Sequence, residues 1–287
     1  MTLLPNRPEA LPMPRPLLGW DWSRPLVMGI VNVTDDSFSG DGLKGEAGAA
    51  IAQARAMIAA GADLIDLGAE STRPGAAPVS VAQEIDRLLP VVQALADCGV
   101  PLSVDTRHAA TMAACLAAGA QIINDISALE DDPAALAVVA ESQAAVVLMH
   151  KQGQPASMQQ APRYDDVVAE VLAYLQTRAA ACIAAGIAPE RIILDPGIGF
   201  GKTQPHNITL MQALPRFRAD GYALLLGVSR KSLIGHLTGE TQPSLRIPGS
   251  VAAALWGAVQ GANILRVHDV DKTVQALRVW QGLAAMA

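Results

Sequence analysis

The chain has 287 residues, of which 51% are hydrophobic and 17% are charged, and its net charge at pH 7 is −6. Aromatic residues make up only 3% and the chain has no basic stripe, which argues against a nucleic-acid-binding protein. The three cysteines lie far apart without CxxC spacing, we expect no apolar stretch of transmembrane length, and we see no signal peptide, so we expect a cytoplasmic protein.

Eight short apolar runs each end in a polar residue. Their Val, Ile and Leu content, with little polar alternation, is typical of strands buried on both faces. The runs are Val27–Asn32, Leu64–Glu70, Pro101–Asp105, Gln121–Asp125, Ala145–His150, Arg191–Asp195, Ala223–Ser229 and Ile264–His268. Segments with helical spacing lie between them, at Gly45–Ala60, Val81–Asp97, His108–Ala118, Pro133–Ser142, Asp165–Ala185, Gln204–Ala219, Pro248–Gln260 and Val270–Leu283. Eight strand–helix units predict an α/β protein, a (β/α)₈ or TIM barrel, with its active site at the carboxyl ends of the strands.

The start of the chain differs in composition from the rest. Residues 1–25 are rich in proline, which excludes a long helix there. We assign them to an N-terminal extension and residues 26–287 to a single barrel domain. Trp20 and Trp22 alternate around Asp21 and predict a short hairpin that closes the floor of the barrel.

Three predicted strands carry Asp105, Asn124 and Asp195 at or next to their carboxyl ends, from which these side chains would project into one pocket. Two carboxylates and an amide form a set rich in hydrogen-bond acceptors, which suits a heterocycle with an exocyclic amine and ring N–H groups. The alternative is that each residue caps the helix that follows it. The other polar residues expected at the same mouth favour a binding site: Asn32, Asp66, Ser229, Arg266 and His268.

Basic residues also gather after the strand ends, namely Arg73, Lys202, Arg230, Lys231, Arg266 and His268. A cationic mouth on an acidic protein predicts an anionic small ligand. Arg73 lies in the run SerThrArgProGly, which in isolation also reads as an ordinary turn. The glycine-rich loop 195–202 fits neither the GxGxxG nor the Walker pattern, so we interpret it as backbone that approaches a flat ligand, with Phe200 as a wall. Asn32 offers an oxygen for Mg²⁺ shared with phosphates.

Eight motifs, one in each predicted strand unit, resemble those of the bacterial dihydropteroate synthases. They are MetGlyIleValAsnValThrAspAspSerPheSer (28–39), GluSerThrArgProGly (70–75), SerValAspThr (103–106), IleIleAsnAspIle (122–126), LeuMetHis (148–150), AspProGlyIleGlyPheGlyLys (195–202), GlyValSerArgLysSer (227–232) and ArgValHisAspVal (266–270). The resemblance extends from residue 26 to about residue 280. One departure is Asp35, where many family members have proline; it adds a negative charge and removes a φ restraint.

The resemblance implies a homodimeric transferase of folate biosynthesis that requires Mg²⁺ and is a target of sulfonamides. It would condense (7,8-dihydropterin-6-yl)methyl diphosphate with para-aminobenzoate to give 7,8-dihydropteroate and diphosphate. By motif position, the pterin would contact Asp105, Asn124, Asp195, Lys231 and Arg266. The diphosphate would lie among Thr72, Arg73, Arg266 and His268, para-aminobenzoate among Thr72, Pro74, Phe200 and Ser229, and Asn32 would bind the metal. The catalytic residues would be Asp105, Lys231 and Arg266.

The expected chemistry needs no protein nucleophile. Diphosphate can leave once its charge is neutralised, and the arylamine is nucleophilic enough to attack the cation left behind, so we expect a dissociative, SN1-like path. Two alternatives remain open. A methyltetrahydrofolate corrinoid methyltransferase would share the Asp/Asn/Asp set but has no need of a diphosphate site, and a non-catalytic pterin-binding paralogue would not need every site position filled.

Overall fold

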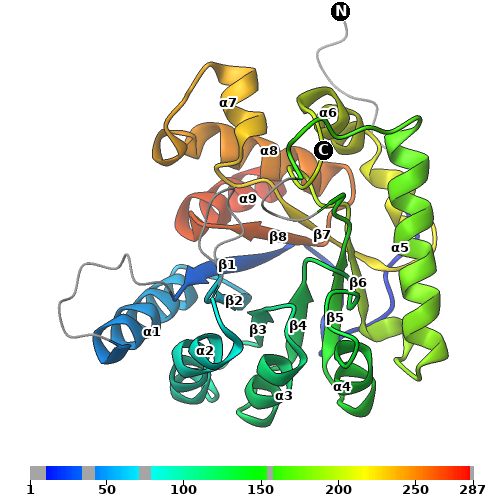
Figure 1. Cartoon of the computed structure of the whole chain (residues 1–287). Helices are drawn as coiled ribbons and strands as arrows, with labels where there is room; N and C mark the ends of the chain where they lie inside the picture. Colours follow the sequence, from blue (N-terminus) through cyan, green and yellow to red (C-terminus); the bar gives the residue numbers. More distant parts are fainter. Residues whose placement is uncertain (1–10, 34–42, 71–78, 154–157, 285–287) are drawn as a thin grey trace, which may run out of the picture.

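The computed structural model describes residues 11–33, 43–70, 79–153 and 158–284. Its strands are β1 (Leu26–Asn32), β2 (Leu64–Gly68), β3 (Leu102–Asp105), β4 (Ile122–Asp125), β5 (Ala145–Met149), β6 (Ile192–Asp195), β7 (Ala223–Gly227) and β8 (Ile264–Val267). All pair in parallel with their neighbours in chain order, and β1 pairs with β8, so the sheet closes. The predicted single-domain (β/α)₈ barrel is confirmed (Figure 1).

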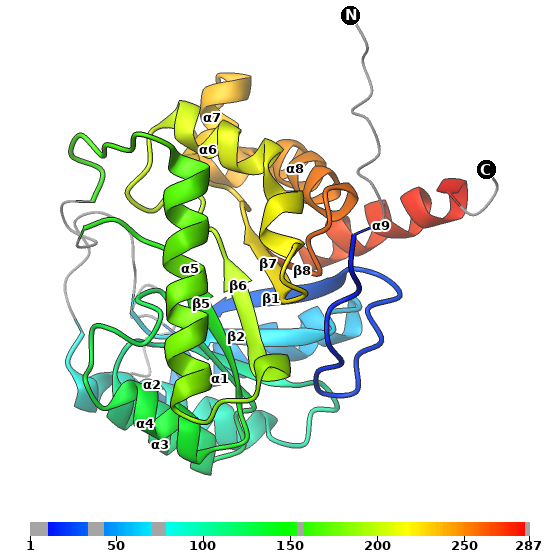
Figure 2. The same cartoon turned by 90° about the vertical axis from the view of Figure 1, so that its right-hand side faces the viewer.

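Helices surround the barrel, as the two views in Figures 1 and 2 show. They are α1 (Leu43–Ala59), α2 (Val81–Leu95), α3 (Ala109–Ala117), α4 (Ala135–Glu141), α5 (Val167–Ala184), α6 (Gln204–Gln212), α7 (Ser232–Thr238), α8 (Ile247–Val259) and α9 (Val270–Ala284). Short 3₁₀ helices occur at η1 (Pro189–Arg191), η2 (Leu214–Arg218) and η3 (Pro243–Leu245).

The structure corrects several predicted boundaries. The helix predicted over Gln204–Ala219 is wrong beyond Gln212, because Pro215 cannot donate the hydrogen bond that would continue it, and η2 follows instead. Helix α7 was not predicted; it has only seven residues and ends at Gly239, whose φ is +79°. Four polar residues predicted as strand ends lie just beyond the strands: Glu70, His150, Ser229 and His268.

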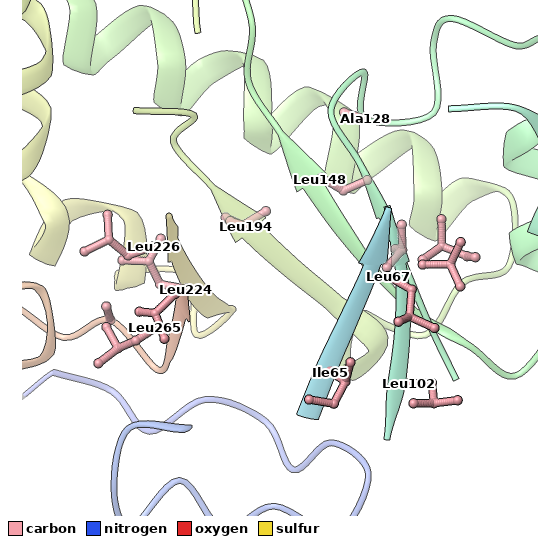
Figure 3. Close-up of a cluster of buried hydrophobic side chains, with 14 of the residues drawn as sticks. Ile65, Leu67, Leu102, Ala128, Leu148, Leu194, Leu224, Leu226 and Leu265 are labelled. Atoms are coloured by element: carbon pink, nitrogen blue, oxygen red, sulfur yellow. The ribbon is translucent and has the colours of Figure 1, made fainter. Parts of the chain in front are cut away.

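Each strand is buried on both faces, which explains its nearly continuous apolar sequence. Side chains such as Ile65, Leu67 and Leu194 point outward into the layer between sheet and helices (Figure 3). Alternate residues, including Leu64 and Ile193, form a separate cluster inside the barrel. The barrel is therefore a packed core, with polar side chains left to its carboxyl end.

The N-terminal segment packs under the barrel. Leu17 and Trp20 form an isolated antiparallel bridge, and the Trp20 and Trp22 rings meet edge to face at 5.4 Å. Leu17 and Trp22 are buried in the same cluster as the inward side chains of the strands. The indole N–H of Trp22 donates to the carbonyl of Arg15 over 2.9 Å, which satisfies the one polar atom of this ring.

Helix α5 corrects the expectation that no apolar stretch reaches transmembrane length. Its 18 residues have a mean hydropathy of 1.4, which is long and apolar enough to cross a membrane by those criteria alone. In the structure α5 packs on β5, and it buries Val168, Val171 and Leu175 against the barrel. Its apolar composition therefore serves the outer core.

Two helical glycines predict opposite stability changes. A Cβ on Gly257 of α8 would overlap the buried Leu226 side chain of β7, whereas a Cβ on Gly48 of α1 would meet nothing within 4 Å. We expect Gly257→Ala to lower the free energy of unfolding by about 1–3 kcal/mol through overpacking. Gly48→Ala should raise it by about 0.5–1 kcal/mol through helix propensity. Urea denaturation measures both, and equal changes of the same sign would contradict this packing.

Candidate active site

Polar side chains from different strands meet at the carboxyl end of the barrel. Register places Asp105 of β3 beside Asn124 of β4, and Asp66 of β2 beside Ser103 of β3. Asp195 ends β6 and Arg266 lies in β8. Because parallel strands of a closed barrel end at one rim, residues far apart in sequence are brought together here.

Arg266 lies at the centre of this group. Its Nε donates to Oδ2 of Asp66 over 2.6 Å, and its Nη2 donates to Oδ2 of Asp105 over 2.7 Å. Burial opposes its charge, but the surrounding carboxylates outweigh burial and raise the pKa of Arg266. Arg266 thus remains a cation held by two carboxylates, and its side chain stays 21% exposed.

Asp66 holds the group together from below. Its carboxylate is fully buried and also accepts from the hydroxyl of Ser103 over 2.6 Å and from the amide of Asn124 over 3.1 Å. The bond from Asn124 uses its NH₂ and leaves its amide oxygen as an acceptor. Asp66 therefore fixes the orientation of Arg266 and Asn124. Sequence reasoning placed Asp66 at the mouth and assigned it no role.

Asp105 keeps 20% of its side chain exposed and is available to a ligand. Burial raises its pKa to about 7 even though Arg266 opposes this, and the Asp66 carboxylate adds to the rise. Glu84 of α2 contributes to this effect as well. Glu84 is buried and accepts from Thr106 and from the ring of His108, over 2.9 and 3.0 Å. No sequence signal separated Glu84 from an ordinary solvent-exposed helix residue.

Asp195 and Lys231 form the opposite side of the group. The backbone N–H of Gly197 donates to Asp195 over 2.7 Å, and burial raises the pKa of Asp195 while Lys231 lowers it. Burial lowers the pKa of Lys231 to about 8. The Lys231 Nζ donates to the carbonyl of Ile198 over 2.5 Å and lies 4.5 Å from the centre of the Phe200 ring.

The loop after β6 packs directly on the loop after β5. A Cβ on Gly197 would overlap the carbonyl of His150, and one on Gly201 would overlap the backbone of Gln152. Both glycines also have positive φ, of 66° and 61°. The close approach that these glycines allow is to neighbouring backbone; the approach of a flat ligand to this loop remains a prediction.

Two of the expected mouth cations have other partners. Lys202 is only 2% exposed, so its predicted place in the cationic mouth is wrong; its Nζ binds the loop itself. Arg230 forms an ion pair with Asp269, with Nε–Oδ2 and Nη2–Oδ1 distances of 3.0 and 2.5 Å. Fewer cationic side chains are therefore available to a ligand at the mouth than the sequence indicated.

The remaining predicted site residues are placed less completely. Ser229 accepts from the backbone N–H of His268 over 3.2 Å and contacts its ring Nδ1 over 3.0 Å, so the hydroxyl positions the imidazole. Asn32 ends β1 with an exposed side chain. Four predicted residues lie outside the described residues: Asp35, Thr72, Arg73 and Pro74.

Comparison with known proteins agrees with this geometry. Residues 28–268 match the family described as "Pterin binding enzyme". The dihydropteroate synthase of Neisseria meningitidis serogroup C is 52% identical over 263 residues, which cover 91% of this chain and 93% of that protein. The Escherichia coli K12 dihydropteroate synthase is 51% identical over 260 residues, covering 90% and 92%.

Solved structures of the same kind superpose closely. The Xanthomonas albilineans dihydropteroate synthase with 4-aminobenzoic acid has a TM-score of 0.86 at 49% identity and covers 92% of this chain and 94% of that one. The Burkholderia cenocepacia enzyme complexed with 7,8-dihydropteroate has a TM-score of 0.87 at 44% identity, covering 97% and 99%. A Yersinia pestis dihydropteroate synthase with a sulfonamide drug has a TM-score of 0.87 at 48% identity, covering 93% and 96%.

Proposed function

The chain belongs to the pterin-binding enzyme family as a dihydropteroate synthase, a transferase and sulfonamide target, and we propose that the group around Arg266 reads the pterin ring. The observation that carries this proposal is the set of acceptors that Asp66 and Arg266 hold in place: Asp105 and Asn124. Together with Asp195 they match the N–H groups of a pterin. The methyltransferase and the non-catalytic paralogue are set aside, because relatives about half identical over nine-tenths of the chain are dihydropteroate synthases.

The reaction follows from this placement. The C–O bond to diphosphate breaks with its electron pair on the leaving diphosphate, and the pterin is left as a methylene cation. Asp105 and Asp195 place negative charge near that cation, and Arg266 stacks on the ring. The amine of para-aminobenzoate then forms the new C–N bond and releases its proton to solvent. We propose this dissociative, SN1-like path, with Asp105, Lys231 and Arg266 as catalytic residues.

In this proposal the diphosphate and para-aminobenzoate contact different sets of residues. His268 and Arg266, with Thr72 and Arg73, bind the diphosphate. Phe200, whose ring already lies against the Lys231 ammonium, lines the para-aminobenzoate end with Thr72 and Pro74. Ser229 joins that wall while its hydroxyl holds His268, so the residue links both ends.

We also propose Mg²⁺ as the cofactor, bound mainly through the diphosphate. Within the described residues there is no group of three or more His, Cys, Asp or Glu side chains that could hold a metal ion. Asn32 fits as a single exposed oxygen ligand at the rim, which suits an ion that keeps waters and phosphate oxygens. The bound ion would neutralise the charge of the leaving diphosphate.

Diphosphate release that depends on para-aminobenzoate tests this function. We expect Asp105→Asn to lower kcat/KM about 30-fold or more, the effect of losing a hydrogen bond to a charged group at a buried site. EDTA should abolish the wild-type activity and excess Mg²⁺ should restore it. Asp131→Asn is the matched control, because Asp131 lies near the mouth but pairs with Lys151 over 2.9 Å. Near wild-type kinetics for Asp105→Asn would overturn the role of Asp105.

We further propose a cytoplasmic enzyme whose residues 26–287 form one catalytic domain and whose extension, residues 1–25, closes the barrel floor. The buried contacts of Leu17 and Trp22 with the inward strand side chains support the role of the extension. The three cysteines are free thiols, which suits a reducing compartment.

A homodimer is proposed through the outer face of α8 and α9. Val279, Trp280 and Leu283 are 60%, 47% and 67% exposed and lie beside Val251 and Leu255 in one apolar groove. Isologous packing of a second copy would cover these side chains. Sedimentation equilibrium should give a dimer for the wild type and a monomer for Trp280→Glu, whereas a dimeric variant would exclude this face.

A further inference from the structure

Lys202 is a buried lysine that the reaction outlined above does not use. Its Nζ lies within 3.0 Å of the carbonyl oxygens of Gly197 and Phe200 and 3.2 Å from the carbonyl of His150. It also lies 2.9 Å from the Nδ1 atom of His150. One ammonium therefore joins the loop after β6 to the end of β5.

The surroundings of Lys202 favour these bonds. Burial lowers the pKa of His150 to about 3, and the neighbouring Lys202 charge adds to that effect, so the imidazole is neutral and its Nδ1 accepts. Burial lowers the pKa of Lys202 to about 7, while Asp195 acts to raise it. Burying a lysine costs free energy unless its N–H groups form hydrogen bonds. Here they donate to carbonyl oxygens and to the imidazole.

Lys202 binds the carbonyls of Gly197 and Phe200, and the segment between these residues contacts the proposed pterin site. Gly197 and Phe200 stand on either side of Ile198, whose carbonyl accepts from the Nζ of Lys231 over 2.5 Å. The Phe200 ring lies 4.5 Å from the same Nζ. The position of Lys231 is thus set by a backbone segment that Lys202 holds at both ends.

Other donors act at the remaining carbonyls of this loop. The hydroxyl of Tyr164 donates to Gly201 over 2.9 Å, and the side-chain amide of Gln159 donates to Gly199. The amide of Gly199 in turn donates to Asn207 over 2.7 Å. Tyr164 and Gln159 lie farther along the loop after β5 and Asn207 lies in α6, whereas Lys202 binds His150 directly at the end of β5.

We infer that Lys202 is a positioning residue, which fixes the loop carbonyls that orient Lys231 toward the pterin ring. The inference rests on the proposed function, since it requires Lys231 to contact the pterin. Lys202 itself does not touch the substrate. Its loss should therefore act through Lys231 and should disappear when Lys231 is already gone.

A double-mutant cycle tests this coupling. Lys202→Met and Lys231→Met are made singly and together, and kcat/KM for the pterin diphosphate is measured at saturating para-aminobenzoate. We expect each single variant to lose about 10-fold or more, the factor for losing a charged hydrogen bond. The double variant should lie within about 2-fold of Lys231→Met alone, since coupled residues are not additive. Losses that multiply in the double variant would overturn the inference.

Controls separate this role from damage to the fold. Thermal melting identifies variants that remain folded, and Lys202→Gln, which keeps a neutral donor, replaces Lys202→Met if that variant does not fold. Lys151→Met is the matched control, because the side chain of Lys151 is 8% exposed in the adjoining loop yet binds Asp131. Any loss of kcat/KM in Lys151→Met should multiply with the loss in Lys231→Met. Wild-type kinetics for Lys231→Met would contradict the placement of the pterin, whereas wild-type kinetics for a folded Lys202 variant alone would contradict only the positioning role.

Discussion

The ion pairs that Arg266 forms with Asp66 and Asp105 determine how the polar side chains at the mouth of the barrel are arranged. Asp66 is fully buried above the apolar interior of the barrel, and an ionised carboxylate there needs a charged partner and hydrogen bonds. Arg266 supplies the charge, and Ser103 and Asn124 supply further donors. Because these donors are committed to Asp66, the directions of Arg266 and Asn124 are fixed before any ligand arrives, which is the preorganisation that binding and catalysis need.

The charged residues at this end of the barrel have two different roles. Asp105 and Arg266 keep part of their side chains exposed and are available to a ligand. Lys202 and Asp66 are buried and hold other groups in place. The net charge of −6 therefore does not describe the mouth, where the exposed part of one guanidinium lies beside the exposed part of one carboxylate.

The architecture was readable from the sequence because strands buried on both faces leave uninterrupted apolar runs, as in Ala145–Met149. The positions of Asp105, Asn124 and Asp195 at or next to the carboxyl ends of β3, β4 and β6 followed from the same pattern. Side-chain partners could not be read in this way. A lysine after a glycine-rich loop has the same sequence signature whether it faces a ligand or, as Lys202 does, the loop carbonyls. An extra helix also escaped: α7 is a second helix between β7 and β8, and a pattern of one helix after each strand leaves no place for it.

The most direct test of this account is the affinity of a pterin without diphosphate for Asp66→Asn, measured by calorimetry beside the wild type. By this account Asp66 does not contact the ligand. Its replacement by asparagine puts an amide where the surrounding donors of the wild type point at a carboxylate. The prediction is a folded protein with affinity lower by about 10-fold or more, because Arg266, Asn124 and Asp105 lose their alignment. Wild-type affinity in the folded variant would show that the pterin is read independently of the buried carboxylate.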